Sequence, residues 1–68
     1  MKLSARNQLP GQILEVTKGP TTARVRIYIG QGATITASIT SEAADELNLK
    51  AGDAALAVIK ASDVMVGK

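Results

Sequence analysis

A chain of 68 residues has room for one domain, because domains run from about 50 to about 250 residues. It contains no Cys and no His, which excludes disulfides, thiolate sites and imidazole sites. Its formal net charge of +2 comes from scattered residues and does not indicate an extended polyanion as partner. Domains this small bury only about 60% of their unfolded surface, so we expect self-association to supplement the core.

Neither a membrane span nor an export signal is expected. The longest apolar stretch, Ala54 to Ile59, is far shorter than the ~20 residues of a spanning helix. The N-terminal residues Met1–Arg6 turn polar too soon for a secretory signal. We therefore expect a cytoplasmic protein.

The first predicted element is a strand over residues 11–18. Ile13, Leu14 and Val16 form its short apolar run, and Lys18-Gly19-Pro20 follows as a breaker.

Strict alternation then predicts a pair of strands over residues 22–29 and 33–40. The residues expected to face inward are Ala23, Val25, Ile27 and Ile29 in the first strand and Ile35, Ala37 and Ile39 in the second. Gly30-Gln31-Gly32 between them tolerates positive φ, so the pair should form an antiparallel hairpin.

A short helix is expected next. Ser41 is the predicted N-cap, and Glu42 lies in the first turn, where a carboxylate is favourable. Ala43, Ala44 and Leu47 should share its buried side, and Asn48 should end it.

The last part of the chain reads as a turn at residues 50–53, a strand over residues 54–61 and a bend at Ser62-Asp63 before Val64, Met65 and Val66. This order predicts a mainly β fold, a small five-stranded Greek-key barrel of the oligonucleotide-binding (OB) type with one short helix. The fold by itself assigns no function.

The side chains available for catalysis are few. Without His or Cys, a nucleophile would have to be Ser or Thr activated by Lys, and no such pair is bracketed by a recognisable motif, so we expect no enzyme. Glu42, Asp45 and Glu46 lack the Asp-x-Asp spacing of a calcium loop and are typical of a solvated helix face.

Two segments combine a cation with hydroxyl or amide donors and contain no carboxylate: Ser4-Ala5-Arg6-Asn7-Gln8 and Lys60-Ala61-Ser62. Arg6 and Lys60 could neutralise a tetrahedral dianion while hydroxyl and backbone N–H groups donate to it. Near neutral pH phosphate keeps a proton that needs an acceptor, whereas molybdate, tungstate and sulfate do not, so donors alone should discriminate against phosphate. On the pattern alone, a solvated surface is the more common explanation of such segments than an anion site.

The chain resembles the molbindin (Mop) family, stand-alone molybdate-binding domains of the TOBE/Mop type. The resemblance is carried by Ser4-Ala5-Arg6-Asn7-Gln8-Leu9 with Gly11, by the strand end Ile39-Thr40, and by residues 58–65, and it runs nearly end to end. It implies an OB-type barrel assembled as a hexamer, a trimer of dimers with exchanged N-terminal strands. The implied ligand is molybdate or tungstate, held between subunits for storage, without a cofactor.

The resemblance also implies which residues hold the oxyanion. One chain would supply Ser4, Arg6 and the adjoining backbone of Ala5, and its neighbour would supply Thr40, Lys60, Ala61 and Ser62. Lys60 would provide charge, the Ser and Thr hydroxyls would donate, and Ala61 would contribute its backbone N–H.

A second family site is implied at the turn formed here by Lys18, Gly19, Pro20 and Thr21. Pro20 has no N–H, so any contact through that atom is lost. Pro10 also departs from the lysine that relatives often carry, which removes a positive charge near the site.

Two other functions remain open on the sequence. A nucleic-acid-binding module is consistent with the barrel and with a pI of about 9.3, but Tyr28 is the only aromatic residue on which a base could stack. An assembly module without a ligand is the other.

Overall fold

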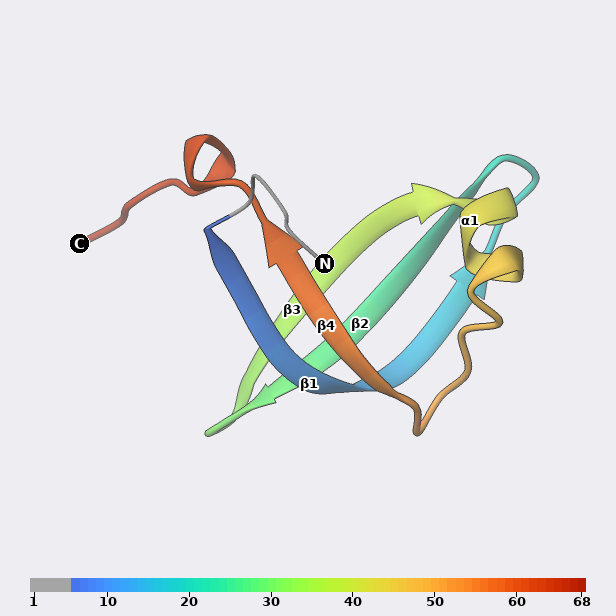
Figure 1. Ribbon diagram of the computed structural model, residues 1–68, viewed down its shortest axis with the longest axis horizontal. Coiled ribbons are helices and arrows are strands. Elements are labelled where there is room, and N and C mark those ends of the chain that lie inside the picture. Colours follow the sequence, from blue (N-terminus) through green and yellow to red (C-terminus); the bar gives the residue numbers. More distant parts are fainter. Residues whose placement is uncertain (1–5) are drawn as a thin grey trace.

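The computed structural model describes residues 6–68 as an antiparallel sheet with one short α-helix (Figure 1). The strands are β1 (Asn7–Lys18), β2 (Thr22–Gly30), β3 (Ala33–Thr40) and β4 (Ala54–Ile59). Helix α1 (Ser41–Glu46) joins β3 to β4, and the 3₁₀ turn η1 (Ala61–Asp63) follows β4. Neither helix in the described residues is long and apolar enough to cross a membrane.

The strand order β3-β2-β1-β4 is that of a Greek key, in which a long connection returns the fourth strand beside the first. The predicted mainly β class and topology are therefore confirmed. The expected count of five strands is wrong for residues 6–68, which form a sheet of four. The sequence located only four strands for that barrel, and residues 64–66, which follow η1, are exposed and form no strand.

β1 begins four residues earlier than predicted, at Asn7 rather than Gly11. The observed strand thus includes Pro10, a residue that cannot donate to a ladder. In this half of the strand, residues 7–11 pair with β4 alone, so one edge of β1 is free and the missing N–H is tolerated.

The second half of β1 pairs with β2, and the change of partner bends the strand. The register shifts between Ile13 and Glu15. The connection before β4 supports this bend, since the Ile13 N–H donates to the Asp53 carbonyl at 2.9 Å and the Gly52 N–H donates to the Ile13 carbonyl at 2.7 Å. The sheet consequently curls around its inner face as in a small barrel.

The core is aliphatic and lies on the concave side of the sheet. Its buried members are Ile13, Ala23, Val25, Ile27, Ala44 and Ala57. The inward-facing pattern predicted for β2 and β3 is confirmed, with the β3 residues partly buried. Gly11 lets β1 cross β2 closely, because a Cβ there would lie 2.4 Å from the Tyr28 carbonyl oxygen.

The predicted helix is present, with its cap shifted by one residue. Thr40 is the N-cap, and its Oγ1 accepts the Ala43 N–H at 3.0 Å, so the prediction of Ser41 is wrong. Leu47 was expected on the buried side but is 67% exposed, because the helix ends there. Asn48 follows with a φ of 52°, which confirms the predicted end of the helix.

β4 ends at Ile59 rather than Ala61, because residues 61–63 turn into η1. The bend predicted at Ser62-Asp63 is confirmed by that turn. Lys60, Ala61 and Ser62 therefore lie in the tight turn that follows β4 at the end of the sheet.

Candidate functional site

The β1–β4 ladder brings the two predicted donor segments together. Asn7 pairs with Ile59, and the Asn7 side-chain amide donates to the Ile59 carbonyl at 3.2 Å. This is the last pair of the ladder, so Arg6 and Lys60 lie one residue beyond it on the two segments, and Lys60 leads into the corner that holds Ala61 and Ser62. We call Arg6, Asn7, Lys60, Ala61 and Ser62 the donor end of the sheet.

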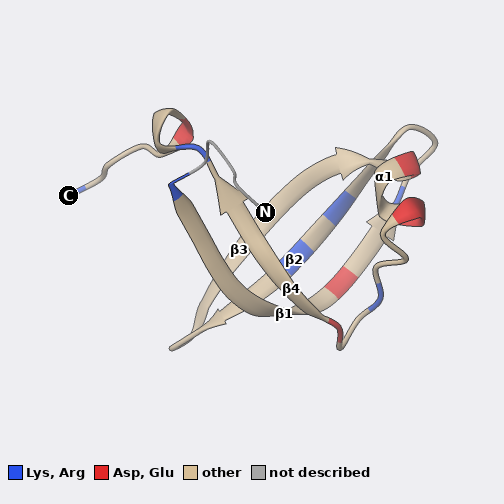
Figure 2. Ribbon diagram, in the orientation of Figure 1, with Lys and Arg blue, Asp and Glu red and all other residues tan. Residues whose placement is uncertain are grey.

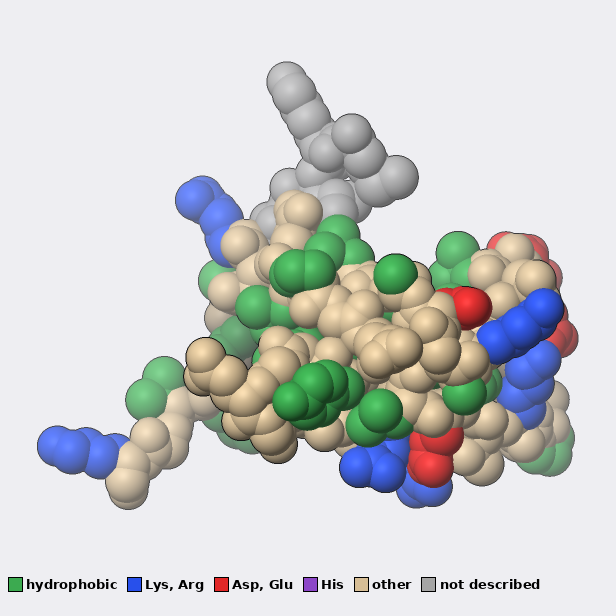
Figure 3. Space-filling view, turned by 90° about the horizontal axis from the view of Figure 1, so that it is seen from below, with side chains coloured by type: hydrophobic (Ala, Val, Ile, Leu, Met, Phe, Trp, Pro, Cys, Tyr) green, Lys and Arg blue, Asp and Glu red, His purple; other side chains and the backbone are tan. Residues whose placement is uncertain are grey.

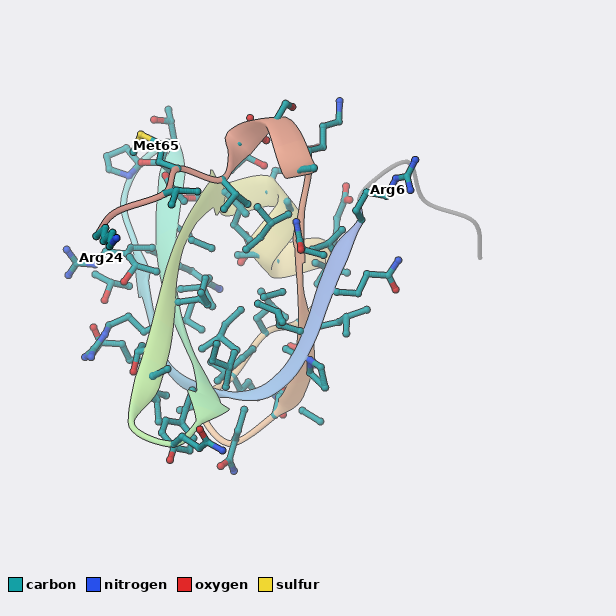
Figure 4. The ribbon with its side chains drawn as sticks, turned by 90° about the vertical axis from the view of Figure 1, so that its left-hand side faces the viewer. Arg6, Arg24 and Met65 are labelled. Atoms are coloured by element: carbon teal, nitrogen blue, oxygen red, sulfur yellow. The ribbon has the colours of Figure 1, made fainter. Side chains whose placement is uncertain are left out.

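The two cations of the donor end are exposed and are not engaged in ion pairs with other described residues. Arg6 and Lys60 make no salt bridge with any residue in the range 6–68. Figure 2 shows basic residues at the start of β1 and at the end of β4, and Figure 4 shows the Arg6 side chain projecting from the end of β1. Two adjacent exposed cations can attract a small anion without first breaking an ion pair.

The η1 turn adds donors beside Lys60. Its backbone is closed by the Asp63 N–H donating to the Lys60 carbonyl at 2.9 Å and by the Val64 N–H donating to the Ala61 carbonyl at 3.2 Å. Within the described part of the chain, these bonds leave the N–H groups of Ala61 and Ser62 without an acceptor. The exposed Ser62 hydroxyl offers one further donor.

One acidic residue near the donor end was not weighed in the sequence analysis. Asp63 directly follows Ser62, and it lines the groove between β3 and β4. Its position immediately after Lys-Ala-Ser was visible in the sequence.

Two of the predicted ligands, Ser4 and Ala5, lie outside the described residues, so their places in the site stay predictions. Arg6 is the first described residue. Of the chain's own N-terminal segment, the structure therefore places Arg6, Asn7 and Gln8.

Thr40 lies away from the donor end in the same chain. It pairs with Thr22 and caps α1, and Figure 1 shows α1 and η1 at opposite ends of the sheet. Its oxygen accepts the Ala43 N–H, which leaves the hydroxyl hydrogen free to donate. The resemblance implies that one chain supplies both Thr40 and Lys60 to the same anion, whereas this placement means that a site using both would need donors from more than one copy of the chain.

The predicted second site is at the other end of the sheet, beside α1. Lys18 forms a salt bridge of 2.5 Å with Asp45 on the helix. The Gly19 N–H donates to the Thr22 carbonyl at 2.7 Å, and the Gly19 carbonyl accepts the Ser41 hydroxyl at 2.8 Å. We call the turn 18–21 together with α1 the α1 end; its polar groups largely satisfy one another.

The Thr21 carbonyl is bound in the same way, accepting the Ser41 N–H at 2.9 Å. The structure thus brings the predicted second-site residues Lys18, Gly19 and Thr21 together around the start of α1. It also shows that these groups are already engaged with α1 and β2, and that Pro20 offers no N–H between them.

The other charged and aromatic residues of the described range 6–68 do not form a further cluster that resembles a binding site. Arg24 and Arg26 lie on the outward face of β2, and Glu15 stands opposite Arg26 in the ladder. The Tyr28 hydroxyl accepts the Gly32 N–H at 3.2 Å, so this ring serves the hairpin turn. Among residues 6–68, no group of three acidic side chains is arranged to hold a metal ion.

A family model for the TOBE domain matches residues 3–66 of this chain. The chain belongs to the TOBE domain family. This TOBE domain is 46% identical over 67 residues to a probable molybdenum-pterin-binding protein of Haemophilus influenzae, with 98% of this chain and 97% of that protein covered. It is 44% identical over 66 residues to molybdenum-pterin-binding protein 1 of Clostridium pasteurianum, with 97% of each covered.

Solved structures agree with the sequence relatives. A molybdate-binding protein from Sporomusa ovata superposes on this TOBE domain with a TM-score of 0.93 at 34% identity, covering both chains completely. The cytoplasmic molybdate-binding protein ModG, with molybdate bound, superposes with a TM-score of 0.90 at 45% identity. That match covers 96% of this chain and 46% of ModG. The resemblance to the stand-alone Mop proteins is confirmed.

Proposed function

We propose that this TOBE domain binds molybdate reversibly as a storage or buffering protein. The observation that carries the proposal is the donor end, where Arg6 and Lys60 lie one residue beyond the last pair of the β1–β4 ladder and form no salt bridge among the described residues. The relatives named for molybdate or molybdenum-pterin binding span nearly the same length of chain. No bond is made or broken in this function.

The chemistry of the donor end suits a fully deprotonated oxyanion. Arg6 offers a planar fork of N–H donors, Lys60 offers a compact charge, and both form charge-assisted hydrogen bonds stronger than neutral ones. The Ser62 hydroxyl and the Ala61 N–H replace part of the hydration shell. Arg6, Lys60 and the Ala61 N–H can only donate, which favours the unprotonated molybdate and tungstate over phosphate; the Ser62 hydroxyl and the neighbouring Asp63 are the groups that could accept a proton.

Completion of the site requires neighbouring copies. Thr40 and the donor end lie on different sides of one chain, so a ligand that contacts both lies between subunits (Figure 1). We propose a homo-oligomer, a hexamer built as a trimer of dimers with exchanged N-terminal strands. Ser4 and Ala5 would then approach the anion from the chain that supplies Arg6.

Two further features of the proposal follow from relatives and from hydrogen bonding. We place the protein in the cytoplasm, as the related ModG is a cytoplasmic molybdate-binding protein. We assign the α1 end a minor role in uptake, because Lys18 is paired with Asp45 and the Gly19 N–H is already used.

The proposal is tested by dialysing the purified protein against molybdate, tungstate, sulfate and phosphate together. Metal and phosphorus analysis after dialysis should find molybdate and tungstate retained and phosphate absent, and the mass of the same sample should exceed that of one chain. A ligand that binds the native form also raises the melting temperature. Absence of retained metal and an unchanged melting temperature would overturn the proposal.

A parallel titration with a single-stranded oligonucleotide addresses the nucleic-acid alternative. Binding by that route depends on phosphate contacts and weakens steeply with salt. We expect no binding at moderate salt, because the described surface offers no stacking platform beyond Tyr28, whose hydroxyl is used in the hairpin.

A further inference from the structure

Asp63 is the one carboxylate at the donor end of the sheet. The chain has six acidic residues, all within the described range. The other five lie in the second half of β1, on α1 and in the connection before β4: Glu15, Glu42, Asp45, Glu46 and Asp53 (Figure 2). On the face shown in Figure 3, the acidic side chains lie among basic ones toward the α1 end. An anion at the donor end therefore has a single carboxylate of the same chain close to it.

A hydrogen-bonded turn holds Asp63 close to Lys60. The Asp63 N–H donates to the Lys60 carbonyl at 2.9 Å, which closes residues 60–63 into one turn ahead of the exposed tail of residues 64–68. A hydrogen bond between the first and fourth residues of a turn brings their Cα atoms to within about 7 Å. The carboxylate is therefore an immediate neighbour of the charge, the N–H groups and the hydroxyl that the proposed anion site uses.

The Asp63 carboxylate has no partner that would reduce its charge. Within residues 6–68 it forms no salt bridge and accepts no hydrogen bond. By contrast, Asp45 is bound to Lys18, and Asp53 accepts the Lys50 N–H at 3.0 Å. On its other side Asp63 lines the groove between β3 and β4, and no other charged residue of the described chain lines that groove. Its negative charge therefore acts on whatever binds beside it.

We propose that Asp63 limits the affinity of the donor end for dianions and so keeps bound molybdate releasable. This inference rests on the proposed function and adds to it a residue that opposes binding. Repulsion is proportional to the product of the two charges, so one carboxylate opposes a dianion twice as strongly as a monoanion. Asp63 thus also shifts the preference of the site toward singly charged oxyanions of the same shape.

The opposite role for Asp63 would be to hold a cation in place for the anion. The carboxylate would then improve binding by orienting Lys60 or Arg6. Asp63 and Lys60 form no salt bridge although one turn contains both, which favours repulsion over this positioning role. The two roles predict changes of opposite sign when the charge of Asp63 is removed.

Calorimetric titration of Asp63→Asn tests the inference. The amide keeps the shape of the side chain without its charge, and no described hydrogen bond is lost, so the ligand-free melting temperature should match that of the parent chain. We expect an affinity about fivefold higher for molybdate and about twofold higher for perrhenate, a tetrahedral oxo-metal anion with one charge. Asp63→Glu, which keeps the charge, and Glu15→Gln, which removes a carboxylate from β1, should bind both anions like the parent chain.

The Lys60→Ala background distinguishes an action on the anion from an action through the lysine. Direct repulsion predicts that Asp63→Asn raises molybdate affinity by a similar factor in Lys60→Ala and in the parent chain. The factor should shrink in both backgrounds at high salt, because mobile ions screen the carboxylate. A factor near one in Lys60→Ala alone would show that Asp63 acts by engaging Lys60, which contradicts direct repulsion.

Two further outcomes would overturn the inference. One is unchanged or weaker molybdate binding in Asp63→Asn, and the other is an equal gain for molybdate and perrhenate. In each of these cases the parent chain still binds molybdate, so the proposed function stands and only the role of Asp63 is lost. Absence of molybdate binding by the parent chain would overturn both.

Discussion

The two ends of the sheet use similar residue types in opposite ways. At the α1 end, Lys18 is held by Asp45 and the Ser41 hydroxyl is bound to the Gly19 carbonyl. At the donor end, Arg6 and Lys60 each lie one residue beyond the last pair of the β1–β4 ladder and form no ion pair within residues 6–68. The difference teaches that a cation marks a binding site only when the surrounding fold leaves it without a partner.

The largest effect is expected from breaking the strand that connects the two ends. In Gly11→Ala, the new Cβ would lie 2.4 Å from the Tyr28 carbonyl oxygen and 2.8 Å from an Ile27 methyl group. The backbone oxygen cannot turn aside, so we expect a loss of about 3 kcal/mol in the free energy of unfolding. Urea denaturation measures it. Gly67→Ala is the control, since no atom lies within 4 Å of its Cβ, and equal stability of the two variants would contradict the close crossing.

Removing the charge at the donor end comes next. Lys60→Ala should weaken molybdate binding at least about tenfold, or about 1.4 kcal/mol, because a charge-assisted contact is lost. Its ligand-free melting temperature should barely change, since Lys60 is exposed and has no ion-pair partner in the described residues. Calorimetric titration gives the affinity, with Lys50→Ala as control. Parent-like affinity in Lys60→Ala would remove this lysine from the site.

Thr40 tests whether the two ends contribute to one site across copies. Thr40→Val loses the oxygen that accepts the Ala43 N–H, which should cost about 1 kcal/mol of stability. It also loses the free hydroxyl hydrogen, so molybdate binding should weaken too. Thr40→Ser keeps both the oxygen that accepts the Ala43 N–H and the hydroxyl hydrogen, so its stability and molybdate affinity should match those of the parent chain. Parent-like affinity in Thr40→Val, with its stability reduced, would place Thr40 in the cap and outside the site.

The smallest effect is expected at the paired end. Asp45→Ala breaks the salt bridge with Lys18, whose side chains are 49% and 64% exposed for Lys18 and Asp45 respectively. Such exposed pairs contribute at most about 1 kcal/mol, and salt screens them. The melting-temperature difference between the parent chain and Asp45→Ala should be larger at low salt than at high salt, and the difference for Glu46→Ala should not depend on salt. Reduced molybdate uptake in Asp45→Ala would show that the α1 end takes part.

Much of the fold could be predicted because alternation reports directly on burial. The β2–β3 hairpin follows from residues whose odd positions are all apolar, and its bounds were correct to within one residue. The beginning of β1 was missed because Pro10 signals a break unless the neighbouring edge is known to be free. The capping residue was missed because Thr40 and Ser41 are both good caps, and only the backbone angles distinguish them.

The candidate site was predictable in composition and not in arrangement. The sequence identified Arg6 and Lys60 as donors in segments without acids, and the register of β1 and β4 brings them together. Nothing in the sequence indicated that Lys18 would meet Asp45, because that contact joins residues 27 positions apart through the packing of α1. The place of a lysine in the fold, rather than its residue type, therefore decides whether it is paired with an acid, as Lys18 is, or free of such a pair among the described residues, as Lys60 is.

The shared strand β1 has a consequence for how the molecule opens. Its first half is bonded to β4 and its second half to β2, and Ile13 at the bend is held on both sides of the chain. Separation of β1 from either β2 or β4 would therefore also weaken the hydrogen bonds of β1 with the other strand. Amide hydrogen exchange should be slowest around Ile13 and should follow global unfolding there, while the exposed tail exchanges freely.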